Sequence, residues 1–404
     1  MKYFVILGRQ PKISFAELES LFGSENVSVF SADIAVLETE LTAEICQRLG
    51  SVIKICEITR EQTFSNWPKL SQNIIHTFSK ISKASPDGKI TIGISLYGLN
   101  IKLKDIEKTG LSAKKVLKSS GHPIRLVPNK QSYLSTPQVI HNKLLTNSGI
   151  EIVAVASGNK LLLGKTIYEQ DIEAYTARDQ ARPKRDAYIG MLPPKLAQTI
   201  INLASGQVEV SEIAQNNSNS TSSKMLLDPF CGTGVVLQEA LLMGYSVVGT
   251  DINPKMVDYS IENISWLKDK YPEATNHYVR IELGDAQDHQ WPKEVAIVAG
   301  ETYLGQPISM IPDPEKLTRL VNETNGLHKR SLANLAKQLS PGTRICLAVP
   351  AWRTKNGFKH LPTLDQLGEI GYNRIEFKHT KLNDLIYIRD NQFVGRELVV
   401  LTVK

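Results

Sequence analysis

The chain has 404 residues, of which 42% are hydrophobic and 22% charged, as in an ordinary globular protein with two or three domains. No apolar run approaches eighteen residues and the N-terminus lacks a cleavage site, so we expect neither a membrane-spanning helix nor a signal peptide. The four widely spaced cysteines argue against a zinc site or a disulfide framework and favour the reducing cytoplasm. We therefore predict a cytoplasmic protein without a metal site.

The first sixty residues are predicted to form a small α/β module. Its elements are strands at Tyr3–Leu7, Val27–Phe30, Ile34–Glu38 and Val52–Ile58 and helices at Ser14–Phe22 and Thr42–Leu49. Ser14 and Glu17 have the spacing of a capping box, in which each side chain binds a free amide at the start of the helix. We therefore expect the first helix to begin at Ser14.

Residues 61–170 are predicted to form a second α/β module with a basic character. It has a strand in "KITIGISLYG", a Lys-rich helix in "IKLKDIEKTGLSAKKVLKSSG" and a hairpin in "EIVAVAS" and "KLLLGKTIYEQ". From Asp87 to Arg185 the chain carries 16 Lys or Arg residues against 8 Asp or Glu residues, although the net charge of the whole chain is only +6. This excess favours a polyanion such as RNA as the partner, and a solvated basic face is the alternative.

Residues 171–190 are predicted to be a linker, either an ordered charged connector or a solvated hinge. The Asn- and Ser-rich segment Ser205–Lys224 is predicted to be a mobile loop. From Met225 onward strands and helices alternate, which indicates a doubly wound, mostly parallel sheet that binds ligands at the carboxyl ends of its strands. The strands are expected at Met225–Asp228, Ser246–Asp251, Arg280–Gly284, Val295–Ala299, Arg344–Val349, Leu385–Arg389 and Glu397–Val403, with helices up to Met243, from Pro254, through Gln338 and near Thr363–Glu369.

A nucleoside-type ligand site is predicted where "MLLDPFCGTGVVLQEALLMGYSVVGTDIN" joins two of these strands. Gly232 and Gly234 open a helix, so backbone amides can approach a ligand closely. Asp251 ends the next strand about twenty residues later, where a carboxylate can accept both ribose hydroxyls. The third glycine of a dinucleotide loop is missing, and Asp228 would repel a pyrophosphate but suits an ammonium group. The combination favours S-adenosylmethionine, a zwitterion with a ribose and an adenine.

Other residues of the same loops are assigned to this site. Asp285 follows a third strand, where its carboxylate can accept a proton from the adenine amine. Cys231 invites comparison with a nucleophilic cysteine, but it lies inside the cofactor turn, so we count it with the cofactor contacts. The further expected contacts are Thr233, Asn253 and Ala286.

The motifs "DPFCGTG" and "RDQARPKRDAYIGMLPPKLAQ", with "LGRQPKISFAELESLFG" and "DLIYIRDNQFVGRELVVL" at the two ends, resemble the THUMP-containing tRNA guanine-N2 methyltransferases. The resemblance covers nearly the whole chain. It implies an N-terminal ferredoxin-like domain (1–60), a THUMP domain that grips the acceptor end of tRNA (61–170) and a Rossmann-like S-adenosylmethionine domain (191–404). It also implies that Asp228 to Gly234 hold the methionine end, Asp251 the ribose and Asp285 the adenine.

One departure from the family concerns its fourth motif, usually Asp/Asn-Pro-Pro-Tyr. Here "VAIVA" runs into "GETYLGQP", so Tyr303 fits the aromatic position while Gly300 takes the place of the acid. Glu301 can supply the acceptor from one position along, because an attacking amine needs its lone pair aligned and its proton accepted. We therefore predict Glu301 and Tyr303 as catalytic residues, and the alternative is a site that no longer transfers methyl groups.

In the THUMP-like segment, phosphate contacts are expected from Lys114, Lys115, Lys118 and Arg125. The function that the resemblance implies is methylation of the 2-amino group of a guanosine in tRNA. Two alternatives remain open, a DNA amino-methyltransferase and a catalytically silent tRNA-binding protein. The target nucleotide, mono- or dimethylation, the oligomeric state and any accessory subunit are left undetermined.

Overall fold

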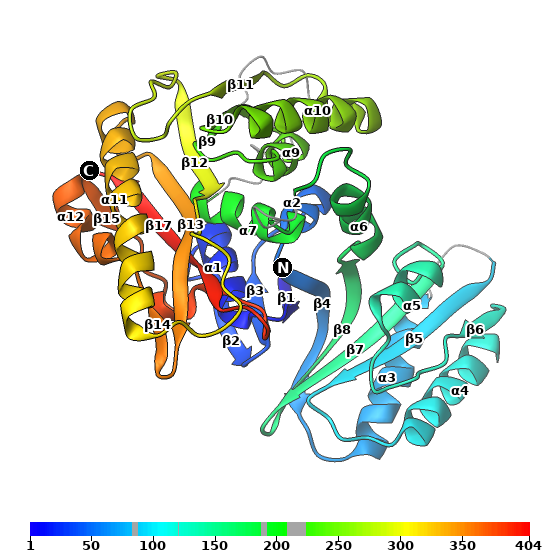
Figure 1. Cartoon of the computed structure of the whole chain (residues 1–404). Helices are drawn as coiled ribbons and strands as arrows, with labels where there is room; N and C mark the ends of the chain where they lie inside the picture. Colours follow the sequence, from blue (N-terminus) through cyan, green and yellow to red (C-terminus); the bar gives the residue numbers. More distant parts are fainter. Residues whose placement is uncertain (83–87, 120, 187–191, 208–223) are drawn as a thin grey trace. The chain divides into compact units, whose positions relative to one another are not determined.

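The computed structural model describes residues 1–82, 88–119, 121–186, 192–207 and 224–404 (Figure 1). These residues form two compact units that are interleaved along the sequence. Unit 1 comprises Met1–Pro11, Glu25–Cys46 and Val52–Glu173, and unit 2 comprises Lys12–Ser24, Gln47–Ser51 and Ala174–Lys404. Because the two units are interleaved, they do not test the domain ranges expected from the sequence. Those ranges remain predictions: 1–60, 61–170, 171–190 and 191–404.

Unit 1 is built on one eight-stranded sheet in the order β2-β3-β1-β4-β8-β7-β5-β6. The long strand β4 pairs antiparallel with β8 from Lys54 to Thr63, so the strands expected in the first two modules share one sheet. The expected hairpin is confirmed, because β7 and β8 pair antiparallel. The strands are β1 (Lys2–Leu7), β2 (Val27–Ser31), β3 (Ile34–Glu38), β4 (Val52–Thr63), β5 (Ile90–Tyr97), β6 (Ile124–Leu126), β7 (Gly149–Ser157) and β8 (Lys160–Glu169).

The helices of unit 1 bury apolar side chains against this sheet. Helices α3 (Trp67–Ser82) and α4 (Leu103–Ser119) share a core with β5 and β7, which includes Phe78, Ile92 and Leu117. The short helix α5 (Thr136–His141) begins with Ser135 as its N-cap. Helix α2 (Ala43–Arg48) crosses the border between the two units, as does α6 (Ile172–Gln180).

Unit 2 contains a nine-stranded sheet in the order β11-β10-β9-β12-β13-β17-β15, with β14 paired to β13 and β16 to β17. Neighbouring strands from β11 through β10, β9 and β12 to β13 pair in parallel, and β17 pairs antiparallel with both of its neighbours in this order, β13 and β15. The predicted mostly parallel sheet is thus confirmed. The strands are β9 (Met225–Asp228), β10 (Ser246–Asp251), β11 (Val279–Leu283), β12 (Val295–Glu301), β13 (Arg344–Thr354), β14 (Gly357–Lys359), β15 (Tyr372–Arg374), β16 (Ile386–Tyr387) and β17 (Val394–Val403).

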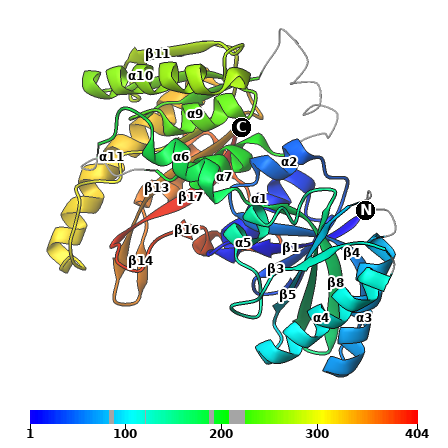
Figure 2. The ribbon, with the colours of Figure 1, turned by 90° about the vertical axis from the view of Figure 1, so that its right-hand side faces the viewer.

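Helices cover both faces of the second sheet (Figures 1 and 2). Alternate residues of a strand point to opposite faces, so Leu226 and Val247 pack into one core while Leu227 and Val248 pack into the other. The first core includes helices α7 (Pro194–Ser205), α9 (Val235–Leu242) and α10 (Pro254–Lys270). The second includes α11 (Pro314–Gln338) and α12 (Leu367–Ile370), so the sheet is doubly wound.

The predicted capping box at the first helix is wrong. Helix α1 runs from Pro11 to Phe22, so Ser14 and Glu17 lie inside it and are buried. The Glu17 carboxylate accepts hydrogen bonds from the amides of Gly50 and Ser51, each at 3.0 Å, and from the Asn202 side chain at 2.7 Å. The Glu17 carboxylate therefore accepts hydrogen bonds from residues distant in the sequence and not from the first amides of its own helix. The local spacing does not reveal these partners.

Smaller differences concern the C-terminal third. Strand β12 continues past Ala299 through Gly300 to Glu301. The helix expected near Thr363–Glu369 is split into a 3-10 turn (η2, Pro362–Gln366) and the short α12. The predicted mobile loop Ser205–Lys224 lies largely outside the described residues.

Candidate active site

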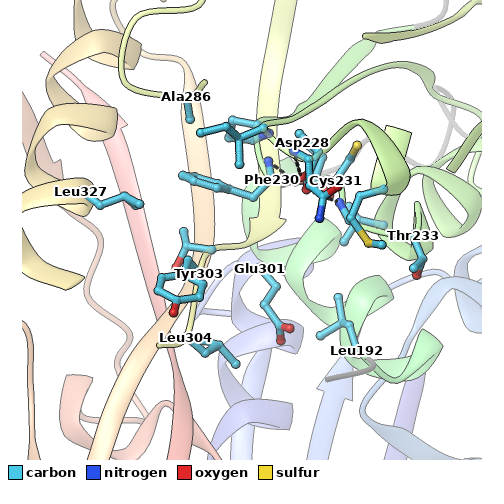
Figure 3. Close-up of a pocket in the computed structure, with 18 of the residues that line it drawn as sticks. Leu192, Asp228, Phe230, Cys231, Thr233, Ala286, Glu301, Tyr303, Leu304 and Leu327 are labelled. Carbon is cyan, nitrogen blue, oxygen red and sulfur yellow. Dashed lines mark hydrogen bonds between the residues drawn. The ribbon is translucent and has the colours of Figure 1, made fainter. Parts of the chain in front are cut away.

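A pocket of about 500 Å³ lies in unit 2 at the carboxyl ends of β9, β10 and β12 (Figure 3). This volume is within the usual range for a small-molecule site. The residues that line it come from the glycine loop, the ends of the strands and the segment after β12. Those that the sequence predicted are Asp228, Cys231, Gly232, Thr233, Asp251, Asn253, Asp285, Ala286, Glu301 and Tyr303.

The glycine loop turns sharply between β9 and α9. Gly232 and Gly234 have φ values of 51° and 81°, which strain any side-chain-bearing residue. A Cβ at Gly234 would lie 2.4 Å from the Ser260 hydroxyl, whereas one at Gly232 would meet no atom closer than 4.0 Å. Gly234 is therefore needed for packing within the protein, and Gly232 leaves open space for a ligand to reach the backbone.

Asp228, at the end of β9, places a buried carboxyl group in the pocket wall. It is 1% exposed and accepts a hydrogen bond of 3.1 Å from the Phe230 amide. Burial raises the pKa of Asp228 well above its usual value, and the nearby carboxylates of Asp251 and Glu301 raise it further. A buried acid with acidic neighbours is a favourable environment for a bound cation.

Asp251 ends the neighbouring strand β10 and also lines the pocket. Its carboxylate accepts the amide hydrogens of Gly232 at 3.0 Å and Asn253 at 2.9 Å. Burial raises the pKa of Asp251, and these two backbone hydrogen bonds oppose the shift. The Asn253 side chain accepts from the Lys255 amide as the N-cap of α10, so the same residue lines the pocket and begins the helix.

The third predicted acid, Asp285, follows β11 and lies in the pocket lining beside buried Ala286. The Asp285 carboxylate accepts from the Gln287 amide at 2.9 Å and from the Gln287 side chain. These local hydrogen bonds fix its orientation. The structure thus brings the three acids Asp228, Asp251 and Asp285, from three successive strands, to one pocket.

Glu301 reaches the pocket from the last residue of β12. Its carboxylate pairs with the guanidinium group of Arg396 on β17, which is 5% exposed. Burial raises the pKa of Glu301, and the charge and hydrogen bonds of Arg396 oppose the shift. The sequence analysis did not identify Arg396. Its only signal was its place in "DLIYIRDNQFVGRELVVL", which shows no chemistry without the sheet.

Packing explains why a glycine, Gly300, stands where the family motif has an acid. A Cβ at Gly300 would lie 2.4 Å from Oδ1 of Asp228 and 3.1 Å from its carboxyl carbon. No side chain fits there while Asp228 keeps its position. The site therefore carries one acid at Asp228 on β9 and another at Glu301 on β12, and Gly300 of β12 packs against the Asp228 carboxyl group.

Tyr303 follows β12 in the segment that borders the pocket, and the residue is 49% exposed. The residue before it, Thr302, is anchored in the protein. The Thr302 hydroxyl lies 2.7 Å from Nε2 of buried His328, whose Nδ1 lies 2.7 Å from the Thr324 carbonyl. Figure 3 shows Tyr303 and Glu301 in the part of the lining away from Asp228 and Cys231. The exposed Tyr303 ring therefore borders the side of the pocket that carries Glu301.

The structure also describes the surroundings of the predicted cysteine and of the predicted phosphate-binding residues. Cys231 is buried, and burial raises the pKa of its thiol well above the usual value, so the reactive thiolate is disfavoured. In unit 1, Lys115, Lys118 and Arg125 are exposed and Lys114 is half-buried, with the lysines on α4 and the arginine on β6. Lys115, Lys118 and Arg125 are thus on the solvent-facing side of their elements.

A residue that the sequence analysis missed, Asn263, ties the linker to the glycine loop. From the buried side of α10 it accepts from the Lys184 amide at 2.9 Å and donates to the Lys184 carbonyl at 3.0 Å. The same side-chain amide donates to the Thr233 carbonyl at 2.8 Å. At least this part of the predicted linker is therefore an ordered connector and not a solvated hinge.

The donor set of the pocket fits S-adenosylmethionine. The buried Asp228 carboxyl suits the cationic methionine end, and the open space at Gly232 admits close backbone contact. Asp251 can accept the ribose hydroxyls, since each carboxylate oxygen has lone pairs beyond its one backbone partner. Over the described ranges, no cluster of three or more His, Cys, Asp or Glu side chains is placed to hold a metal ion.

Comparison with known proteins places these features among methyltransferases. A family model described as DNA methylase matches residues 165–262. The tRNA (guanine(10)-N2)-dimethyltransferase of Pyrococcus abyssi is 25% identical over 398 residues, which is 96% of this chain and 99% of the relative. The enzyme of that name from Methanothermobacter thermautotrophicus is 32% identical over 174 residues, and that alignment spans 43% of each chain.

Among solved structures, TrmN from Thermus thermophilus aligns over 100% of both chains with a TM-score of 0.50 and 14% sequence identity. At this identity the likeness concerns the fold alone, and it confirms the predicted α/β architecture. In the parts of the chain that the structure covers, no helix has the length and apolar character needed to span a membrane.

Proposed function

Because this chain belongs to the tRNA guanine-N2 methyltransferase family, we propose that it is an S-adenosylmethionine-dependent enzyme that methylates the exocyclic N2 of a guanosine in tRNA. The observation that carries the proposal is the pocket itself. One side of it has the glycine loop and three strand-end acids, and the other has the Glu301 carboxylate and an exposed tyrosine. The near full-length match to a curated member supports the same substrate.

The cofactor is assigned to the first side of the pocket. Asp228 and the glycine loop would hold the methionine end, Asp251 the ribose and Asp285 the adenine. The neighbouring contacts would be Cys231, Thr233, Asn253 and Ala286. When bound, S-adenosylmethionine supplies an electrophilic methyl group, and the electron pair of the broken carbon–sulfur bond stays on sulfur.

The guanine base is assigned to the second side. Glu301 accepts a hydrogen bond from the 2-amino group, which aligns the nitrogen lone pair, and it takes the proton that this nitrogen releases when it is methylated. Tyr303 offers an exposed aromatic face for stacking on the base. To reach this pocket the base must leave its stack, as in other enzymes that modify bases.

Docking of tRNA is assigned to unit 1. We propose that residues 61–170 are a THUMP-type module whose phosphate contacts include Lys114, Lys115, Lys118 and Arg125. Phosphate contacts of this kind make the affinity fall steeply with salt, because bound counterions are released. A salt-independent affinity would contradict this part of the proposal.

A DNA amino-methyltransferase is the second candidate, and the family model that matches residues 165–262 favours it. The same cofactor loop serves an adenine or cytosine amine. The two candidates differ in the nucleic acid that they prefer. Duplex DNA that outcompetes tRNA for the protein would favour the second.

The deciding experiment uses unmodified tRNA transcripts, labelled S-adenosylmethionine and mass spectrometry of the digested nucleosides. The wild type and Glu301→Gln are compared, and position 10 is examined first because the relatives' names specify it. We expect N2-methylguanosine or its dimethyl form from the wild type. A loss of about 10²- to 10⁴-fold is expected for the variant, the usual contribution of a positioned proton acceptor.

Two outcomes contradict the proposal. Methyl transfer to adenine or cytosine in DNA, with none to tRNA, would establish the second candidate. Tight tRNA binding with no methyl transfer and no S-adenosylmethionine binding would mean that the chain is a silent RNA-binding protein.

A further inference from the structure

We propose that His328 is a positioning residue for methyl transfer: its Nε2 accepts a hydrogen bond from the Thr302 hydroxyl and so fixes the backbone that presents Tyr303 to the guanine base. The inference rests on the proposed function and adds to it a buried residue of helix α11 that acts through Thr302. It concerns one hydrogen bond between this helix and the end of strand β12, both in unit 2.

Thr302 is the last anchored residue before an irregular segment. Its amide donates to the Ala348 carbonyl on β13 at 3.0 Å. Residues 303–312 then lie outside helices and strands, and in the part of the chain that the structure describes they form no hydrogen bond before Asp313 caps α11. Residues 303–307 line the pocket. The placement of this part of the lining therefore depends on how firmly Thr302 is held.

The direction of the hydrogen bond follows from the other partner of His328. The Nδ1 atom lies 2.7 Å from the Thr324 carbonyl, which can only accept, so Nδ1 carries a hydrogen. Burial lowers the pKa of His328 to about 4, so the ring is neutral near pH 7 and Nε2 has a free lone pair. The Thr302 hydroxyl, 2.7 Å from Nε2, therefore donates to it. The Ala348 carbonyl, 3.1 Å from the same hydroxyl, already accepts from the Thr302 amide.

His328 is a rigid partner because it lies in the middle of a long, packed helix. It is 2% exposed, and Leu332 and Leu335 of the same helix belong to a buried core that they share with the sheet. Leu327, its neighbour on α11, lines the pocket (Figure 3). The hydrogen bond thus ties the end of β12 to a helix that forms part of the pocket wall, in addition to the tie to β13.

This tie matters because Thr302 lies between the two residues assigned to the base. Glu301 precedes it and Tyr303 follows it, and within the described ranges the Tyr303 side chain has no hydrogen bond of its own. The ring is therefore placed by its backbone and by packing. A base that is to be methylated must be held in one orientation, and a small misplacement of a positioning group slows the reaction strongly.

The test compares variants that remove the hydrogen bond from either end. They are Thr302→Val, His328→Leu and the double variant, with Thr302→Ser and His328→Gln as conservative changes. For each we measure kcat and KM for N2 methylation of the tRNA transcript, the Kd of S-adenosylmethionine by calorimetry, and unfolding in urea.

We expect each disruptive single variant to lower kcat/KM for tRNA by about tenfold or more. The double variant should be no slower than the slower single variant, because both changes remove the same hydrogen bond. Thr302→Ser keeps the hydroxyl and His328→Gln keeps an acceptor, so both should retain most of the rate. The Kd of S-adenosylmethionine should stay unchanged, because the cofactor is assigned to the other side of the pocket.

The stability of the same variants separates positioning from a structural role. Thr302→Val leaves Nε2 of His328 buried without a donor, which should lower the free energy of unfolding. The double variant no longer contains this unpaired acceptor, so its stability should recover. A purely structural role predicts that the rate recovers with the stability. Positioning by His328 predicts that the rate stays low.

Ser331→Ala is the matched control. Ser331 lies on α11, is 2% exposed and lines one small internal cavity together with His328 and Thr302. Its hydroxyl has no hydrogen-bond partner among the described residues. Removal of this buried hydroxyl changes the same region of the helix without a loss of hydrogen bonding, so we expect kcat/KM to stay unchanged.

The outcomes separate the two proposals. N2 methylation of guanosine by the wild type, with an unchanged kcat/KM in folded Thr302→Val and His328→Leu, would overturn this inference alone. A rate that recovers with stability in the double variant would overturn it too, as would an equal loss of rate in Ser331→Ala. Failure of the wild type to form any N2-methylguanosine would overturn the proposed function, and the inference with it.

Discussion

Gly300 offers a sharp test of how the pocket is packed. In Gly300→Ala the new methyl group would lie 2.4 Å from Oδ1 of Asp228, about 1 Å inside an ordinary contact. Asp228 ends a buried strand and is 1% exposed, so its carboxyl group must shift or the strands must separate. Overpacking of this kind usually costs about 1–3 kcal/mol.

We expect much of this cost to appear in cofactor binding, because the displaced group is the proposed partner of the methionine end. A cost of 1–3 kcal/mol corresponds to S-adenosylmethionine binding weakened by about 5- to 150-fold. The assay is isothermal titration calorimetry on the variant and wild type, with thermal unfolding measured in parallel. Gly300→Asp, which restores the acid of the family motif, should bind the cofactor still less well.

Gly326→Ala is the control. Gly326 lies inside helix α11, and a Cβ there would meet nothing closer than Nη1 of Arg330 at 3.4 Å. It should leave cofactor affinity unchanged and raise stability by up to about 1 kcal/mol, the helix preference of Ala over Gly. Wild-type cofactor affinity in a folded Gly300→Ala protein would refute the packing argument.

Three further predictions follow from the same structure. Burial lowers the pKa of His328 from 6.5 to about 4, so the unfolded chain binds more protons than the folded one between these pH values. The free energy of unfolding should therefore fall by about 1.4 kcal/mol per pH unit as the pH drops through this window. Urea unfolding at pH 7 and pH 5 should show a smaller loss of stability in His328→Gln than in the wild type. Cys231→Ser should keep methyl transfer within about tenfold and the native thiol should resist alkylation, whereas abolished activity at normal cofactor affinity would support a nucleophilic cysteine. Replacing Lys114, Lys115 and Lys118 together by Gln should weaken tRNA binding and reduce the slope of log affinity against log salt by about two to three, and an unchanged slope would place the phosphate contacts elsewhere.

Much of the cofactor side of the pocket could be predicted from the sequence. Asp228, the glycine loop and Asp251 lie within one short strand–helix–strand stretch, and alternation of elements predicts a parallel sheet. Since the carboxyl ends of parallel strands meet at one edge, acids that follow successive strands must converge there. The doubly wound sheet was predictable for the same reason, because its strands are apolar and its connections are helical.

The pairing on the side of the pocket that we assign to guanine depends on the tertiary structure. Arg396 is 95 residues from Glu301 and meets it only because β13 inserts between β12 and β17. The capping-box prediction failed at Glu17 for a similar reason, since its amide partners lie more than thirty residues away at Gly50 and Ser51. Local spacing shows which side chains a helix or strand end presents, but the partner of a buried charge depends on strand order and register. Those are set by how the whole chain buries its apolar surface, and no short stretch of the sequence records them.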